Sequence, residues 1–156
     1  MQRVNIGERD PGPLRDGHEG FRAAREHLGR VLGATATGTS MWDIEPGQAA
    51  CPYHYEHGEE EWALVIRGRP SVRTPDGVEQ LEPLDLLFFP TGPAGAHQFL
   101  NETDETVRVL MWSNVVYPSS TVYPDSDKVG VWTGDDAEDL VLPRSAAVDY
   151  YEGESG

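Results

Sequence analysis

The stretch that decides the fold is CPYHYEHGEEEW, residues 51–62. It packs two imidazoles and four carboxylates into the eight residues from His54 to Glu61. Because side chains alternate between the two faces of a strand, His54 and Glu56 are predicted to share a face, and His57 to point away. If the residues after His57 turn the chain, Glu61 begins the next strand and can face back toward His54. The pattern predicts a cluster of acidic and imidazole side chains where two strands meet.

The chain on either side of this stretch consists of short apolar runs separated by turn residues. Residues 62–67 (WALVIR) form a predicted buried strand that ends at Gly68, and residues 86–89 (LLFF) form another. Residues 75–77 (PDG) lie between two strand-like runs, which predicts a hairpin. A helix is expected only over residues 20–28. Many short strands with one short helix exclude a parallel α/β sheet and favour an all-β sandwich, barrel or jelly roll.

The composition of the chain divides it into three regions. Residues 1–30 are polar and are predicted to form an arm that packs on the barrel or on a second subunit. Residues 31–116 carry the strand pattern and are predicted to form the barrel. Residues 117–156 are rich in serine, proline and aspartate and are expected to form an irregular extension that packs on the barrel.

The charge of the chain limits its partners. Its 156 residues include 27 acidic and 12 basic side chains, a net charge of −15. Such a negative field repels nucleic acid and anionic membranes, which excludes both as expected partners. The single cysteine, Cys51, cannot form an internal disulfide, and the longest apolar runs are too short to cross a bilayer. We therefore expect a cytoplasmic protein that acts on a small molecule.

A third histidine, from a distant segment, extends the cluster. His97 begins a strand-like segment that follows a loop rich in glycine and proline. In a closed barrel this segment can be a neighbour of the strands that carry His54, Glu56 and Glu61. Two imidazoles and one or two carboxylates would then bind one divalent metal ion and leave coordination positions open, a set that suits Fe, Mn, Ni or Zn.

In these residues the sequence resembles the small single-domain members of the cupin superfamily. The first cupin motif is G-(x)5-H-x-H-(x)3-4-E-(x)6-G and the second is G-(x)5-P-x-G-(x)2-H-(x)3-N. The residues that match them are Gly47, His54, Glu61 and Gly68, and then Pro90, Gly92, His97 and Asn101. The resemblance covers residues 31–115, with one extra residue before His54 and two before His97. It implies a cupin-type double-stranded β-helix, or jelly-roll barrel, in which His54, Glu61 and His97 are metal ligands.

The chain departs from the family pattern at two positions. Glu56 stands where the second histidine of the first motif is usual, so the metal would have two histidines and up to two glutamates. A carboxylate ligand favours oxygen-preferring metals such as Mn(II) or Fe(II). Alternatively, His57 enters the site through a local bulge. At the other position, Leu84 replaces a glycine, and we expect this to alter a turn and to leave the metal unaffected.

The surroundings of the cluster suggest a substrate pocket. Four residues are predicted to line it: Trp42, Tyr53, Phe99 and Met111. Arg73 or Arg108 could neutralise a substrate carboxylate, although a surface position suits either equally well. Cys51 is expected to be a small buried residue, because no neighbouring cation in the sequence would lower its pKa.

Two functions fit these residues. One is a metal-dependent enzyme, an oxygenase, isomerase or lyase that acts on a small polar or aromatic molecule, with Glu56 as the general base if it leaves the metal. The alternative is a non-catalytic cupin that binds or senses a small molecule, with His54 and His97 as structural residues. For either function we expect a homodimer, since open sheet edges need protection.

Overall fold

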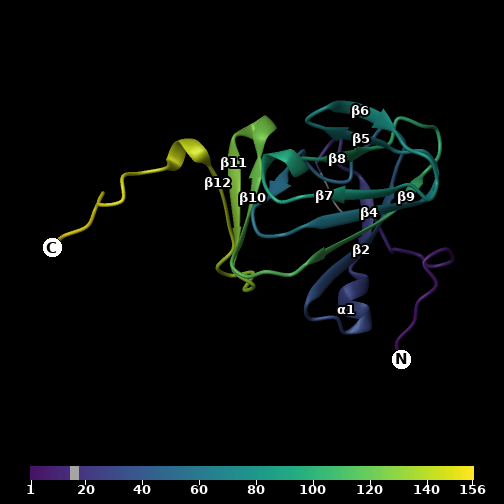
Figure 1. Ribbon diagram of the computed structural model, residues 1–156, viewed down its shortest axis with the longest axis horizontal. Coiled ribbons are helices and arrows are strands. Elements are labelled where there is room, and N and C mark those ends of the chain that lie inside the picture. The colour runs from purple at the N-terminus through teal and green to yellow at the C-terminus, as the bar shows by residue number, and fades with distance from the viewer. Residues whose placement is uncertain (15–17) are drawn as a thin grey trace.

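A computed structural model describes residues 1–14 and 18–156 of the chain (Figure 1). Its strands are β1 (Ala23–Glu26), β2 (Thr37–Ile44), β3 (Tyr55–Glu56), β4 (Glu61–Arg67), β5 (Ser71–Thr74), β6 (Gly77–Gln80), β7 (Leu86–Phe89), β8 (Gln98–Leu100), β9 (Val107–Asn114), β10 (Ser119–Tyr123), β11 (Lys128–Trp132) and β12 (Leu140–Pro143). The helical elements are α1 (Leu28–Leu32) and the 3-10 turns η1 (Pro93–Gly95), η2 (Pro124–Ser126) and η3 (Arg144–Ala146). Every strand pair among the described residues is antiparallel. The prediction of an all-β fold is confirmed.

The strands form three sheets. A five-stranded sheet has the order β1-β2-β9-β4-β7, and a three-stranded sheet has the order β6-β5-β8. In Figure 1 these two sheets lie one above the other, with α1 against β2 on the far side of the larger sheet. The third sheet, in the order β12-β11-β10-β3, stands at one end of the other two.

Alternating side chains build the core. Ala63 and Val65 of β4 are fully buried, whereas Trp62, the residue before Ala63, is 36% exposed. The same alternation puts Val107 and Val109 of β9 into the core. The remaining members of the core cluster are Ala23, Trp42, Ile44, Ala50, Val72, Leu81, Phe89, Phe99 and Met111. Because an alternating strand is half-buried, these sheets enclose an apolar interior while their outer faces stay accessible.

Two predictions about the ends of the chain are corrected by the structure. The segment 20–28 was expected to be helical, but it contains the strand β1, and α1 begins only at Leu28. Ala23 pairs with Ile44 of β2 and is buried, so pairing with a neighbouring strand overrides a weak helical pattern. The region 117–156 is not irregular throughout, because it supplies β10, β11 and β12. The predicted arm also includes residues 15–17, which lie outside the described residues.

The predicted hairpin around residues 75–77 is confirmed as β5 and β6, with Thr74 paired to Gly77. At the other predicted turn, Leu84 has φ 76°, the left-handed conformation that glycine adopts without strain. Its N–H still donates to the Val65 carbonyl at 2.8 Å. The replacement of glycine therefore leaves a strained leucine in a left-handed conformation at this turn.

A buried ion pair ties the N-terminal residues to the barrel. Nε and Nη2 of Arg108 donate to the two carboxylate oxygens of Asp43, each at 2.6 Å, and Nη1 donates to the carbonyl of Ile6 at 2.7 Å. Arg108 is only 4% exposed and Asp43 9%. No helix among the described residues is long and apolar enough to span a membrane.

Candidate metal centre

A pair of backbone hydrogen bonds brings the two predicted histidines together. The N–H of His54 donates to the carbonyl of His97 at 3.1 Å, and the N–H of His97 donates to the carbonyl of His54 at 2.8 Å. This bridge precedes β3 on one side and β8 on the other, and it sets the ring centroids 4.8 Å apart. Residues that are distant in the sequence are thus held side by side by their own backbones.

Glu61 completes the cluster from the first position of β4. Its Oε2 lies 3.8 Å from Nε2 of His54 and 3.6 Å from Nε2 of His97. One ligand atom from each of the three residues falls within 4.8 Å of the others. Two imidazole nitrogens and one carboxylate oxygen at this separation surround a space that suits a single divalent cation.

The hydrogen bonds of the two imidazole rings leave Nε2 of each ring free to face the space next to Glu61. Nδ1 of His54 is 2.9 Å from the carbonyl of Pro52, and Nδ1 of His97 is 2.9 Å from the carbonyl of Gly95. A carbonyl only accepts, so each Nδ1 carries the proton and each Nε2 presents a lone pair. Such a second contact is usual for histidine ligands of metals, since it fixes both the tautomer and the orientation of the ring.

His97 supplies the observation that tests the fit of a metal ion. Its side chain is 1% exposed, and its Nε2 has no hydrogen-bond partner among the described residues. A buried nitrogen lone pair without a partner is costly, and a cation coordinated by this atom would satisfy it. The ring is stacked on Phe89, with centroids 3.8 Å apart, so it cannot turn readily toward another donor. The residues present therefore fit a divalent metal ion.

Gly95 is required for this placement. A Cβ at Gly95 would lie 1.8 Å from the carbonyl oxygen of Pro90, an impossible approach. Only glycine lets the chain pass so close to Pro90 and direct its own carbonyl at His97. A residue between Gly92 and His97, at a position that the second motif leaves unspecified, thus orients a predicted ligand.

Burial shifts the protonation of the cluster. Burial raises the pKa of Glu61 from 4.5 to about 7, with a further contribution from Glu56 and Glu59 and with opposition from the electrostatic interactions with His54 and Arg25. Burial, together with the charge of His54, lowers the pKa of His97 to about 3, which keeps this imidazole neutral at neutral pH. A bound cation would offset the cost of burying the Glu61 carboxylate.

Replacing Glu61 with glutamine is expected to stabilise the metal-free protein at pH 8 by on the order of 2–3 kcal/mol. The pKa of Glu61 is higher in the folded chain than its ordinary 4.5, so its contribution to stability falls as the pH rises from 4.5 to about 7. His97 also contributes to the free energy of unfolding, and this contribution is lost as the pH falls from 6.5 toward about 3. It is the same in both proteins and therefore cancels in the difference between them. Urea unfolding of the two proteins at pH 4.5 and pH 8 measures the difference, which should vanish at the lower pH.

Glu60→Gln is the matched control, because Glu60 is an exposed neighbour in the same turn. It should change neither the stability at pH 8 nor its pH dependence. Equal stabilities of wild type and Glu61→Gln at pH 8 would contradict the burial of an uncompensated carboxylate.

Glu56 lies beside the cluster and not within it. Both of its carboxylate oxygens are 2.7 Å from Oγ1 of Thr121, which donates to them and accepts from Nε1 of Trp132 at 2.6 Å. Burial raises the pKa of Glu56, and the hydrogen bond from Thr121 and the charge of His54 lower it. The structure thus groups His54, Glu61 and His97 but not Glu56, whose ligation was predicted from the motif. Thr121 could not be recognised from sequence, because it belongs to the extension that was expected to be irregular.

The alternative ligand, His57, is placed away from the cluster. It is exposed, and its ring makes an edge contact with Tyr55, with centroids 5.3 Å apart. Its backbone N–H donates to the carbonyl of Ser120 at 2.9 Å, which extends the pairing of β3 with β10. The orientation expected from strand alternation is the one observed.

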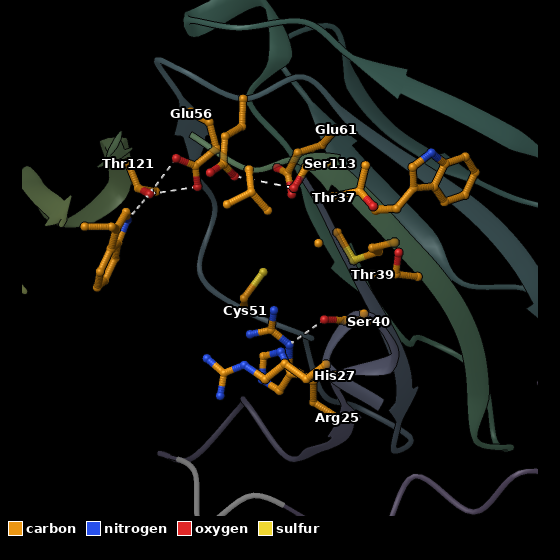
Figure 2. Close-up of a pocket in the computed structure, with 18 of the residues that line it drawn as sticks. Arg25, His27, Thr37, Thr39, Ser40, Cys51, Glu56, Glu61, Ser113 and Thr121 are labelled. Carbon is orange, nitrogen blue, oxygen red and sulfur yellow. Dashed lines mark hydrogen bonds between the residues drawn. The ribbon is translucent and has the colours of Figure 1, made fainter. Parts of the chain in front are cut away.

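A cavity of about 730 Å³ opens beside the cluster. His54, Glu56 and Glu61 lie on its wall, and Figure 2 shows Glu56 and Glu61 together on one side of it. Of the four residues predicted to line a pocket, Trp42 and Met111 do so. This volume suits a small molecule.

The other two predicted pocket residues, Phe99 and Tyr53, are not among the described residues that line the cavity. Phe99 is fully buried in the core, where it contacts Phe89 edge to face. The ring of Tyr53 lies under the guanidinium of Arg73, 4.0 Å from its centroid. The direction of an aromatic side chain is set by its own strand or loop, even when a metal ligand is close to it in the sequence. Both of these side chains point away from the cavity.

The two arginines considered for substrate binding are engaged elsewhere. Arg73 forms a bidentate pair with Asp125 at 2.6 and 2.9 Å, and Arg108 is buried with Asp43. A different arginine, Arg25 of β1, lines the cavity. It was missed because its segment was expected to be a helix within the arm.

Comparisons with known proteins identify relatives of the fold. Residues 40–113 match the family model described as a cupin domain. A crystal structure from Acidithiobacillus ferrooxidans, of a protein provisionally named a sugar phosphate isomerase, is 25% identical and has a TM-score of 0.75 over 83% of this chain and 81% of that one. A sugar phosphate isomerase from a cupin superfamily, from Silicibacter pomeroyi, is 23% identical with a TM-score of 0.74, over 80% of this chain and 78% of that one.

A polyketide cyclase from Streptomyces resistomycificus is also similar, at 23% identity and a TM-score of 0.55, over 73% of this chain and 79% of that one. No curated protein sequence matches the chain. The matched structures agree with the all-β barrel fold.

Proposed function

Residues 40–113 of the chain form a cupin domain, and from this premise we propose that the protein is a metal-dependent isomerase of a small hydroxylated carbonyl compound. The observation that carries the proposal is the unpartnered Nε2 of His97, which faces Glu61 beside His54. His54 and Glu61 also line the cavity. The protein from Acidithiobacillus ferrooxidans, 25% identical, supports the isomerase class through the activity in its name.

His54, Glu61 and His97 would hold the metal ion. When bound, the ion supplies a Lewis acid that polarises a carbonyl and an adjacent hydroxyl of the substrate. The two histidines would fix its position through rings whose Nδ1 atoms are tied to backbone carbonyls. Because His54 and Glu61 line the cavity, an ion held by them would be accessible to substrate oxygens bound there.

Glu56 is suited to move the proton in such a reaction. Burial raises its pKa, which favours uptake of a proton by the carboxylate. In an aldose–ketose isomerisation, one proton leaves the carbon that bears the hydroxyl and one returns to the former carbonyl carbon. The hydroxyl proton passes to the former carbonyl oxygen, so no oxidant is needed. The hydroxyl of Thr121 would hold the carboxylate in place during both transfers.

Two measurements test this function. The purified protein, stripped of metal and reloaded separately with Mn, Fe, Ni or Zn, should bind one ion per chain. The loaded protein should then incorporate solvent deuterium at the carbon next to the carbonyl of a ketose, as followed by NMR. A protein that binds no metal, or that binds one and never exchanges this proton, would refute the isomerase. Stabilisation by a ligand without turnover would instead support a cupin that binds or senses a small molecule.

A second copy of the chain is the partner that we propose for the outer face of the five-stranded sheet. Strand pairing places six apolar side chains on that face: Trp62, Leu64, Leu86, Phe88, Leu110 and Trp112. Phe88 is 44% exposed and Leu86 59%. No position among these six is charged, so two chains of net charge −15 can approach there with the least repulsion.

Light scattering is expected to give twice the 17.2 kDa mass of the chain. Phe88→Lys should shift the protein toward the monomer, because it buries a charge in the apolar contact. Val78→Lys serves as the control, since Val78 is 59% exposed on β6 in the other sheet. A monomeric wild type would contradict the dimer.

A further inference from the structure

The cavity beside the metal centre has a basic end. Arg25, His27 and Arg30 line it, although acidic side chains outnumber basic ones in the chain by 27 to 12. Figure 2 shows Arg25 and His27 on the side opposite Glu56 and Glu61. Basic side chains therefore lie on one side of the cavity and Glu56 and Glu61 on the other, in a wall that also includes Asp136 and Asp139.

Arg25 is held in a defined orientation at this end. Its Nε donates to Oγ of Ser40 at 3.0 Å, a contact drawn in Figure 2. Its guanidinium carbon lies 4.7 Å from the ring centroid of Trp42, a cation–π contact. Because Ser40 and Trp42 both belong to β2, which pairs with β1, the position of Arg25 is set by the sheet and not by a loop. A rigid guanidinium loses little entropy when it binds a ligand.

The wall between the two ends is hydroxylated. Ser40 of β2 and Ser113 of β9, which share the inner face of the sheet with Trp42 and Met111, line the cavity, and both are labelled in Figure 2. Short hydroxyl side chains donate and accept hydrogen bonds, which suits a ligand that carries several hydroxyl groups. A volume of about 730 Å³ is ample for a chain of five or six carbons with a charged terminus.

We propose that Arg25, assisted by His27 and Arg30, binds the phosphate group of the substrate, whose hydroxyl and carbonyl oxygens lie at the metal centre. The substrate class is a small phosphorylated polyhydroxy carbonyl compound. A guanidinium group matches the spacing of two phosphate oxygens. Two arginines can neutralise a phosphate dianion, whereas a carboxylate carries only one negative charge. The assignment deepens the proposed function and rests on it for the placement of the reacting end.

Arg25→Gln tests the phosphate site, with inorganic phosphate as the probe in calorimetric titrations. We expect the affinity for phosphate to fall at least about tenfold in both the metal-free and the Mn-loaded protein, because a charge-assisted bidentate contact is lost. Arg25→Lys should recover part of the loss. Arg22→Gln is the matched control: it removes the same charge from an exposed residue that is not among the described lining residues, and it should bind phosphate like wild type. Acetate should bind at least about tenfold more weakly than phosphate.

The outcomes separate the phosphate site from the metal centre. Phosphate affinity that is unchanged by Arg25→Gln, or reduced equally by Arg22→Gln, would overturn the assignment, as would equal binding of acetate. An anion bound only by the Mn-loaded protein and insensitive to Arg25→Gln sits on the metal, which also overturns it. With a substrate of this class, Arg25→Gln should raise KM and leave the Mn affinity unchanged. Arg25-dependent phosphate binding in a protein that takes up no metal would instead refute only the proposed function.

Discussion

Replacing His97 with alanine is expected to abolish stoichiometric binding of a divalent metal ion. Its Nε2 is one of three atoms that converge on the candidate site, and without it only His54 and Glu61 of this group remain. The loss of a ligand should weaken metal affinity by more than the tenfold to 100-fold typical of losing a supporting hydrogen bond, so a fall of at least about 100-fold is expected. Metal content after dialysis, together with calorimetric titration of Mn and Zn, measures it.

His54→Ala tests the same site without a change in the core, because His54 lies on the cavity wall whereas His97 is stacked on Phe89. Both variants should lose the thermal stabilisation that wild type gains from added metal. His57→Ala is the control, since it removes an exposed imidazole from the same stretch. Full metal binding by either His97→Ala or His54→Ala would remove the basis of the metal centre.

Replacing Glu56 with glutamine is expected to lower kcat by about 10²–10⁴-fold while one metal ion still binds per chain. Glutamine keeps an oxygen that can accept the hydrogen bond from Thr121, but it cannot take up a proton. The structure places Glu56 beside the cluster of His54, Glu61 and His97, so metal affinity should change little. Deuterium incorporation into the substrate should fall in parallel with kcat.

The comparison of affinity with rate distinguishes a base from a ligand. If Glu56→Gln weakens metal binding as strongly as His54→Ala, Glu56 is a ligand, as the motif suggested, and not the base. Glu60→Gln, an exposed carboxylate of the neighbouring turn, should leave both the rate and the affinity unchanged. An active Glu56→Gln variant would require another group to move the proton.

The chain itself determined those features that depend on short-range pattern. Alternation along residues 62–67 was sufficient to place Ala63 and Val65 inside, and the turn at 75–77 was sufficient for a hairpin. The spacing of His54 and Glu61 predicted a shared site for the same reason, because the number of residues between two side chains limits which faces they occupy.

Only the tertiary structure decided which distant segments became neighbours. Residues 23–26 form β1 because they pair with β2, and this pairing places Arg25 on the wall of the cavity. Thr121 met Glu56 because β10 paired with β3, although its region looked irregular. Phe99 faced the core instead of the pocket. The spacing of side chains along a strand follows from the local sequence. The choice of the strand with which it pairs depends on the burial of many strands at once, so a local pattern cannot predict it.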